Sequence, residues 1–396
     1  MSRRLQALWS RHHEALRDPH RVSVQWEWGE DVDPRLLRHR VRGDFWGAVE
    51  AAGGRLLVSR EYEHLLVALT VERSRPRVSY LRLPHPSGMA VDAEGQRLHV
   101  ASTRNPNMLF DLAPCRGFVD RHGAAAPRDL ETALLPVRCR YLPGALYIHD
   151  LARIGRRLFA NAVAWNAVVE ISDGFRPVWW PKSIERKDGP LLDRNYLQLN
   201  SIAAGKTLAD SFFTASVEAP AARRPGDPRF PVDRTGVVFS GRTRGVVARG
   251  LTRPHSARFV RGRLLVANSG YGQLVEVRSG RSEEIARLPG WTRGLSGDGR
   301  LAFVGTSRVI PRFRQYAPGL DPERCECGVH AVELPAGRTV GSLLWPEGNQ
   351  IFAVELARGL ATIGFPFTAR PSLRQVERFF FLGAASGSLP SRSGRR

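Results

Sequence analysis

The stretch RGRLLVANSG, residues 261–270, is the clearest copy of a pattern that recurs along this chain of 396 residues. The pattern consists of a glycine or polar turn, then Arg-Leu, then apolar residues and finally small polar ones. Further copies are GGRLLVS (53–59), EGQRLHVAST (94–103), IGRRLFANA (154–162), DGRLAFVGTS (298–307) and a diverged copy, ADSFFTAS (209–216). Six copies at steps of about 37 to 60 residues predict a β-propeller, in which each repeat forms one blade.

A second recurring strand precedes each copy. The six examples are WGAVEAAG from Trp46, HPSGMAVDAEG from His85, HDLARIG from His149, NSIAAGK from Asn200, HSARFVRG from His255 and TRGLSGDG from Thr292. Alternating small and apolar residues are typical of an inner strand, which lines a crowded central channel. Two more strand-like runs follow each pair, separated by turns rich in Gly and Asp. The expected fold class is all-β, with six four-stranded blades.

The two ends of the repeat region add further strands. The run QIFAVELARGLATIGF (350–365) predicts two strands, and RVSVQWEWG (21–29) predicts one. These strands form either a mixed seventh blade or additions to a six-bladed ring, and we favour six. In both cases, pairing the two ends covers the sheet edge that an open ring would expose.

The predicted organisation has three parts. Residues 1–20 form a short N-terminal helical extension, because Leu5, Leu8 and Trp9 fall at helical spacing. Residues 21–370 form the propeller. Residues 371–396 form a C-terminal extension, and from about 384 the sequence AASGSLPSRSGRR is of low complexity and is expected to be disordered.

The formal net charge of +21 suggests an affinity for anions. Only Lys182, Lys187 and Lys206 among the 59 basic residues are lysines, an imbalance that codon usage in a GC-rich genome produces. The arginines are spread along the chain, and no basic and aromatic motif of a nucleic-acid-binding module is present. A specific nucleic-acid partner is therefore not expected.

Targeting signals and cysteines indicate the compartment. The N-terminus lacks the apolar region of a secretory signal, and no apolar run is long enough to span a membrane, so a cytoplasmic location is expected. The four cysteines would then be reduced. Cys325 and Cys327 form a C-x-C pair, which we interpret as ordinary cysteines because no second pair accompanies it at metal-binding spacing.

The repeats resemble a bacterial β-propeller family known only as a domain of unknown function. The segments that carry the resemblance are PHPSGMAV, YIHDLA, LNSIA, RPHSARFVRGRLLVANSGYGQLVEV, LPGWTRGLSGDGRLAFVG and NQIFAVEL, within roughly residues 25 to 365. More distantly, the chain is similar to NHL-repeat propellers and to the gluconolactonase–strictosidine synthase group. The resemblance implies a propeller and supplies no activity. The chain departs from the pattern at Asn200, where a histidine would be expected.

Three of the eleven histidines, His85, His149 and His255, each begin a predicted inner strand. The matching positions hold Trp46, Asn200, Arg293 (or Thr292) and Asn349 (or Gln350). Equivalent positions in a propeller converge at one end of the channel, so these side chains are expected to face one another. The same pattern would also arise from duplication of the blade alone. In that case each polar side chain forms hydrogen bonds with nearby backbone groups, and the cluster is not a binding site.

Two chemistries suit such a cluster. Three histidines can hold one divalent metal, Zn, Mn or Ca, with an open position that polarises a substrate oxygen or activates water. Trp46, Asn200, Arg293, Asn268, Tyr271 and Asn349 are candidate ligand-binding residues, because Arg293 can hold a carboxylate or sulfate and the others can orient the ligand. Asp150 is a candidate for assisting His149.

Three functions follow from these observations. The first is a propeller that binds a small polar or anionic ligand and acts beside a partner enzyme or assembly. The second is a metal-dependent lyase or hydrolase that uses His85, His149 and His255. The third is an interaction scaffold with an inert channel.

Overall fold

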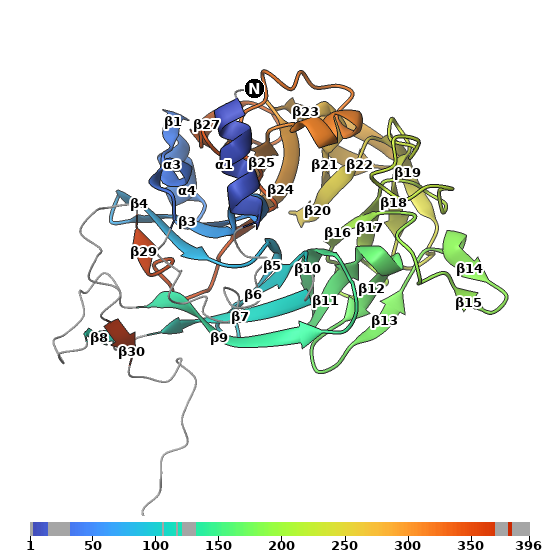
Figure 1. Ribbon diagram of the computed structural model, residues 1–396, viewed down its shortest axis with the longest axis horizontal. Coiled ribbons are helices and arrows are strands. Elements are labelled where there is room, and N and C mark those ends of the chain that lie inside the picture. Colours follow the sequence, from blue (N-terminus) through green and yellow to red (C-terminus); the bar gives the residue numbers. More distant parts are fainter. Residues whose placement is uncertain are drawn as a thin grey trace, which may run out of the picture.

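The computed structural model describes residues 3–14, 32–104, 107–115, 118–120, 132–368 and 379–381. Six sheets surround a central axis, as Figure 1 shows, and the molecule is a six-bladed β-propeller. The predicted fold class is confirmed, and the open question of six or seven blades is settled at six. The expected strand at 21–29 and the expected disorder from 384 lie outside the described residues.

Blades II to V are antiparallel sheets of four strands that follow one another from the channel to the rim. Blade II contains β5 (Pro86–Asp92), β6 (Arg97–Ser102), β7 (Asn107–Cys115) and β9 (Ala133–Leu142); blade III contains β10 (Ile148–Ile154), β11 (Arg157–Ala162), β12 (Ala167–Glu170) and β13 (Arg176–Trp179). Blade IV contains β16 (Leu199–Ala203), β17 (Phe212–Ala215), β18 (Gly236–Ser240) and β19 (Val246–Leu251); blade V contains β20 (Pro254–Val260), β21 (Arg263–Asn268), β22 (Gln273–Arg278) and β23 (Arg281–Arg287).

Blades I and VI contain the strands that close the ring. Blade I contains β28 (Ala353–Leu356), β2 (Arg55–Arg60), β3 (Leu65–Glu72), β4 (Arg75–Arg82) and the short β29 (Phe367–Thr368). Blade VI contains β24 (Trp291–Gly297), β25 (Leu301–Ser307), β26 (Gly328–Glu333), β27 (Thr339–Leu344) and, at its outer edge, β1 (Arg40–Gly43). The late strand β28 therefore supplies the inner strand of the first blade, and the early strand β1 covers the edge of the last.

The prediction of an inner strand at Trp46 is wrong. Residues Phe45–Ala51 form helix α4, which Asp44 caps by accepting a hydrogen bond from the main-chain N–H of Gly47. The inner position of blade I is instead taken by β28, whose Leu356 pairs with Leu56 of β2. Trp46 packs edge-on against Phe45 beside the core and is not among the residues that line the axial cavity described below.

Further helices and short strand pairs lie outside the blade sheets, and several of them are in connections between strands of the same blade. They are α1 (Arg3–Glu14), α3 (Pro34–Leu37), η1 (Glu61–Glu63), η3 (Val163–Trp165), η4 (Lys182–Ile184), η5 (Ser269–Tyr271), η6 (Pro311–Tyr316) and the strand pairs β14 (Glu185–Arg186) with β15 (Gly189–Pro190) and β8 (Phe118–Asp120) with β30 (Phe379–Phe381). The predicted N-terminal helix is present as α1. Its Leu8 and Trp9 are buried, and the Trp9 indole N–H donates to the carbonyl oxygen of Glu347.

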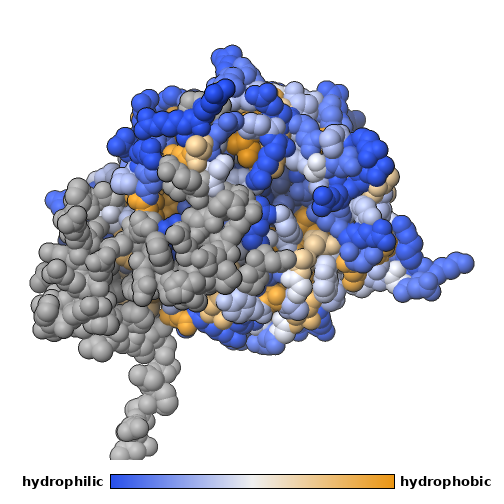
Figure 2. Space-filling model, in the orientation of Figure 1, coloured by the Kyte–Doolittle hydropathy of each residue, from blue (hydrophilic) through white to orange (hydrophobic). Residues whose placement is uncertain are grey.

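The hydrophobic core lies between neighbouring blades. Separate clusters of buried apolar side chains join blades II and III, III and IV, IV and V, and V and VI, and a larger cluster joins blade I to blades II and VI. Because the apolar side chains on the faces of the sheets are buried between the blades, the polar side chains lie mainly at the rim and in the channel. The described part of the face in Figure 2 is accordingly mainly hydrophilic.

Candidate functional site

A cavity of about 500 Å³ lies at one end of the central channel. Its walls come from the starts of the inner strands and from the connections on the same end of the ring. Among these connections are η1, η6 and the loop within blade IV that contains Arg224, Pro225 and Gly226. The cavity therefore draws its residues from all six blades.

The strand register shows which residues of the six blades are equivalent. Pro86, Ile148 and Pro254 pair with Ser102, Ala162 and Asn268, which end the six-residue strands β6, β11 and β21. The residues that precede these positions form a first ring, namely His85, Tyr147, Gln198, Arg253, Trp291 and Gln350. The residues that follow them form a second ring, namely Ser87, His149, Asn200, His255, Arg293 and Phe352.

The backbone supports this alignment. Four members of the first ring have left-handed backbone conformations, with φ of 46° at His85, 56° at Tyr147, 50° at Gln198 and 52° at Arg253. A positive φ is uncommon for residues other than glycine, so its repetition at one position marks a recurring turn of the chain into the inner strand. Beyond this turn, five of the inner strands contain a bulge or irregularity in their pairing.

The cavity is lined by most members of both rings. From the first ring it includes Tyr147, Gln198, Arg253, Trp291 and Gln350, and from the second ring His149, His255, Arg293 and Phe352. Of the residues singled out in the sequence, His149, His255, Arg293 and Gln350, the alternative to Asn349, line this cavity.

His85 is placed differently from the other two histidines. It belongs to the first ring, so its equivalent in blade V is Arg253 rather than His255. Its ring packs edge-on against His64, with 4.3 Å between ring centres, and its Nδ1 lies 3.9 Å from Oε1 of Glu61. His85 is buried and is not among the residues that line the cavity.

The three histidines do not form a joint ligand set. The rings of His149 and His255 are inclined to each other by 29°, with 6.2 Å between their centres. Within the described parts of the chain, no group of three or more His, Cys, Asp or Glu side chains is arranged to hold a metal ion. The metal site thus stays a prediction. A third protein ligand beside His149 and His255 would have to come from outside the described residues.

The remaining sequence candidates lie beside or outside the cavity. Asn200 is buried behind the wall, where its Nδ2 donates to Ser216 Oγ at 3.1 Å and to the Pro254 carbonyl at 2.9 Å. Asn349 is also buried, and its main-chain N–H donates to Oε1 of Glu63 at 2.6 Å. It is the next residue, Gln350, that reaches the cavity.

Asn268 and Tyr271 lie on a separate shallow pocket of about 290 Å³. Asn268 is held by the main-chain N–H of Thr252 at 2.7 Å and by Gln273, and the Tyr271 hydroxyl donates to Asp233 at 2.9 Å. Asn268 ends the second strand of blade V and Tyr271 lies in η5 directly after it, and neither residue lines the axial cavity.

Asp150 forms part of a buried ionic network instead of assisting His149. Arg258 donates to both oxygens of Asp150, at 2.7 and 2.8 Å, and to Oε1 of Glu355 at 2.9 Å. These residues come from blades III, V and I, and all three are charge-paired. The network ties three inner strands together across the channel.

Two arginines in the cavity wall are buried without such a partner. Arg253 is 2% exposed and Arg293 is 5% exposed. Within the described residues, neither guanidinium forms an ion pair with a carboxylate. Burial lowers the pKa of both Arg253 and Arg293 to about 10, so both remain charged at neutral pH.

Neutral groups hold these two guanidiniums in place. Arg253 donates to the side-chain oxygen of Gln198, and its guanidinium carbon lies 4.2 Å from the centre of the Tyr316 ring. The guanidinium carbon of Arg293 lies 3.3 Å from the centre of the Phe352 ring. Nε of Arg253 and Nη2 of Arg293 are buried with no hydrogen-bond partner among the described residues.

The mouth of the cavity is also basic. Arg104, Arg224 and Arg312 line it, whereas Glu61 is the single carboxylate among its described lining residues. Glu61 accepts a hydrogen bond from Thr103 and lies 3.9 Å from Nη2 of Arg104. With Arg253 and Arg293 included, five guanidiniums face one carboxylate.

Comparison with known proteins places this chain among propellers of unassigned activity. The model of a family described as "Domain of unknown function (DUF4915)" matches residues 43–363. The chain belongs to the DUF4915 family. None of the curated proteins matches it in sequence.

Among solved structures, a chain from a nidogen–laminin complex is similar to this DUF4915 protein with a TM-score of 0.51 and 11% identity, covering 77% of this chain and 99% of that one. The WD40 propeller domain of Doa1 has a TM-score of 0.39 at 10% identity, covering 70% and 91% of the two chains. A streptogramin B lyase has a TM-score of 0.35 at 11% identity, covering 65% and 67%. At these identities the similarity concerns the fold alone.

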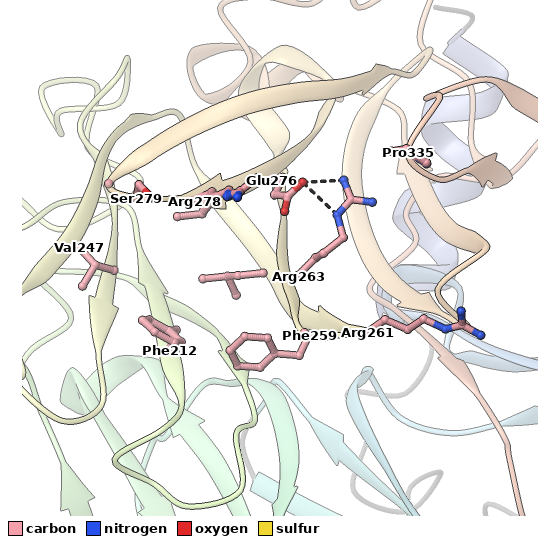
Figure 3. A pocket seen from close by; sticks show the side chains of 13 residues that line it. Phe212, Val247, Phe259, Arg261, Arg263, Glu276, Arg278, Ser279 and Pro335 are labelled. Carbon is pink, nitrogen blue, oxygen red and sulfur yellow. Dashed lines mark hydrogen bonds and ion pairs between the residues drawn. The ribbon is translucent and has the colours of Figure 1, made fainter.

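A second hollow on this DUF4915 propeller has a different character. It is an open groove of about 1020 Å³ with a floor that includes Phe212 and Phe259, shown in Figure 3. Its central arginine, Arg263, is already paired with Glu276, at 2.9 Å from Nε and 2.5 Å from Nη2. Of these two hollows, the axial cavity is therefore the one whose buried arginines form no ion pair among the described residues.

No helix in the described residues is long and apolar enough to cross a membrane. The four cysteines, Cys115, Cys139, Cys325 and Cys327, are free. The cytoplasmic location stays a prediction.

Sequence reasoning missed most of the residues that make the cavity basic. Arg253 lies two residues before His255, a distance that also separates Tyr147 from His149. The signal for this first ring is the proline shared by HPSG and RPHS, which aligns His85 with Arg253. Arg104, Arg224 and Arg312 lie in connections, and no repeat pattern marks them.

Proposed function

We propose that the axial cavity of this propeller binds a small anionic molecule through Arg253 and Arg293. The observation that carries the proposal is the burial of both guanidiniums without an ion pair among the described residues, although the carboxylate of Glu61 in the same cavity favours the charged form of Arg293. Elsewhere among the described residues, the largely buried Arg258 is paired with both Asp150 and Glu355.

Physical chemistry favours an anion at this position. A buried charge without a partner is unfavourable, because it has lost its hydration and gained no compensating interaction. A carboxylate, phosphate or sulfate would supply the missing interaction, and a guanidinium binds these groups with two parallel N–H donors. The unpartnered Nε of Arg253 and Nη2 of Arg293 are donors of this kind.

The volume of the cavity, its positive charge and its aromatic walls support the same function. Its volume of about 500 Å³ lies within the usual range for small-molecule sites. Arg104, Arg224 and Arg312 at the mouth would attract anions and raise their local concentration. The aromatic walls, including Tyr147 and Trp291, offer apolar surface to the rest of the ligand.

The alternative of a metal-dependent lyase or hydrolase would require a third ligand beside His149 and His255. The described residues do not supply one in a suitable arrangement, since His85 packs against His64 and Asp150 is engaged by Arg258. A partner enzyme or assembly remains a proposal that no contact in the structure tests.

Thermal unfolding with added anions tests the proposal. The melting temperature of the wild-type protein should rise with phosphate, sulfate or citrate at constant ionic strength, because a ligand that binds the folded state stabilises it by mass action. Arg253→Met and Arg293→Met should each abolish this rise. Arg278→Met is the matched control, since Arg278 is exposed on the groove of Figure 3.

One outcome of these melting experiments would contradict the proposal. An equal rise in wild type, Arg253→Met and Arg293→Met would show that the anions act elsewhere on the surface. Calorimetric titration of the same proteins would confirm the stoichiometry, and the proposal requires about one anion per chain that is lost with either arginine.

A further inference from the structure

We propose that the molecule bound in the axial cavity carries, besides its anionic group, a hydroxyl or N–H group that donates a hydrogen bond to Nε2 of His255. The chemical class is a hydroxylated carboxylate or a hydroxylated phosphate ester. The inference rests on the proposed function and specifies the ligand further.

The hydrogen bonds of His255 determine which of its nitrogens carries the proton. Nδ1 lies 2.8 Å from the carbonyl oxygen of Arg253, which can only accept, and 3.0 Å from the hydroxyl oxygen of Ser269. That hydroxyl donates its own proton to the carbonyl of Thr292 at 2.6 Å, so towards His255 it acts as an acceptor. Both partners of Nδ1 therefore require Nδ1 to be the donor.

The other nitrogen is then an acceptor. Burial, with added repulsion from Arg293 and Arg253, lowers the pKa of His255 well below its ordinary value, so the ring is neutral at pH 7. A neutral imidazole protonated on Nδ1 presents a lone pair on Nε2. Nε2 is buried and has no hydrogen-bond partner among the described residues, and His255 lines the cavity.

A second acceptor lies in the same wall. The side-chain oxygen of Gln350 is buried without a described hydrogen-bond partner, and Gln350 also lines the cavity. The cavity thus holds the unpartnered donors of Arg253, Arg293 and Trp291 together with the unpartnered acceptors of His255 and Gln350, and Nδ1 of His149 is likewise without a described partner. A simple inorganic anion satisfies the donors alone, whereas a hydroxylated anion satisfies both sets.

Matched ligands test the inference on the wild-type protein. Tartrate and succinate have the same carbon chain and charge, and only tartrate has hydroxyl groups. Dimethoxysuccinate keeps the oxygens of tartrate but lacks their protons. Glycerol 3-phosphate and propyl phosphate form the corresponding pair of phosphate esters, and comparison of the two pairs identifies which anionic group the cavity prefers.

We expect the hydroxylated member of the preferred pair to bind about tenfold more tightly by calorimetry, the change that one additional hydrogen bond produces. With the carboxylate set, dimethoxysuccinate should bind no better than succinate. His255→Phe should remove the advantage of the hydroxyl group. His255→Gln, which can place an acceptor near the position of Nε2, should restore most of it.

The outcomes separate the two proposals. If no anion binds, or if binding survives loss of Arg253 and Arg293, the proposed function fails. If anions bind through both arginines but the hydroxylated and plain members of each pair bind equally, only the present inference is wrong. It would also be wrong if Nε2 were occupied by a metal, which binding of added Zn²⁺ at one equivalent, lost in His255→Phe, would reveal.

Discussion

The guanidinium carbon of Arg293 lies 3.3 Å from the centre of the Phe352 ring, although the two residues are 59 positions apart in the sequence. They occupy equivalent places in blades VI and I, and Phe352 directly precedes the closing strand β28. The proposed anion site therefore lies at the seam where the ring closes. Cation–π contact can hold a guanidinium in position while leaving its N–H groups free for a ligand.

Arg293→Met should leave the ligand-free protein as stable as the wild type, or more stable by about 1–3 kcal/mol, because it removes a buried charge that forms no ion pair among the described residues. Arg258→Met should instead cost about 3–5 kcal/mol, since it leaves Asp150 and Glu355 buried without their cation. Urea unfolding at pH 7 measures both changes. A large destabilisation by Arg293→Met would mean that a partner for this arginine exists within the protein.

The buried histidine His330 should make the protein sensitive to acid. Burial lowers its pKa to about 4, and its ring nitrogens contact Thr306 and Ser342. Because the folded pKa lies below the unfolded value of about 6.5, the stabilisation is complete above pH 6.5 and is lost as the pH falls towards 4. The loss should reach roughly 2–3 kcal/mol from this group.

Urea unfolding between pH 7.5 and 4 measures this effect as the difference between wild type and His330→Gln. The variant should be less stable at pH 7.5 and should approach the wild type as the pH falls. A constant difference across the range would show that His330 does not titrate as expected.

Ionisation of Glu355 should lower the stability of the protein as the pH rises, whereas protonation of His330 lowers it as the pH falls. Burial raises its pKa to about 7, even though Arg258 lies 2.9 Å away and favours the charged form. Since the folded pKa exceeds the unfolded value, the contribution of Glu355 is complete below about pH 4.5 and is lost as the pH rises through 7.

Glu355→Gln tests this directly, because the amide cannot ionise and can still accept from Arg258. The stability of the variant relative to the wild type should rise by about 1–2 kcal/mol between pH 5 and pH 8. If the relative stability falls over this interval instead, the carboxylate is charged throughout and Arg258 governs its ionisation.

Gly294→Ala should disturb the seam between blades VI and I. A Cβ at this position would lie 2.7 Å from Cγ2 and 2.9 Å from the main-chain nitrogen of Val354 in β28, and the residue has φ of +84°. We expect a loss of about 2–4 kcal/mol from the clash and the strained backbone together.

Gly262→Ala provides the matched control for this prediction. Gly262 has a similar φ of +78°, but no atom lies within 4 Å of its would-be Cβ. Gly262→Ala should lower the free energy of unfolding by only about 1 kcal/mol, because only the strain of the left-handed backbone contributes. Equal losses in the two variants would show that the closeness of Val354 does not matter.

The propeller could be predicted from sequence because its repeats carry local patterns. Each Arg-Leu stretch forms a second strand, as at Arg97–Ser102 and Arg263–Asn268. The inner strand of blade I could not be found in the same way, because it is contributed by residues 353–356 from far along the chain. The segment from Trp46, which precedes the first repeat where an inner strand is expected, forms a helix capped by Asp44.

The candidate site could be predicted in part. His149, His255 and Arg293 do line one cavity, because equivalent positions converge at the channel. An alignment of the repeats by their histidines places His85 wrongly. The strand register makes Pro86 equivalent to Pro254, so His85 corresponds to Arg253. The unpartnered charge of Arg253 could not be inferred from sequence, because pairing of charges depends on which side chains meet in space.

The closing strand has a consequence for how the protein acquires its cavity. Gln350 and Phe352 reach the cavity only when β28 has paired with β2, so a chain that has built blades II to VI but not joined its ends has an incomplete wall. An open ring and a closed ring would differ in their ability to hold a ligand, and any occupant would draw the population towards closure. Occupancy of the cavity would thereby depend on closure of the ring by β28.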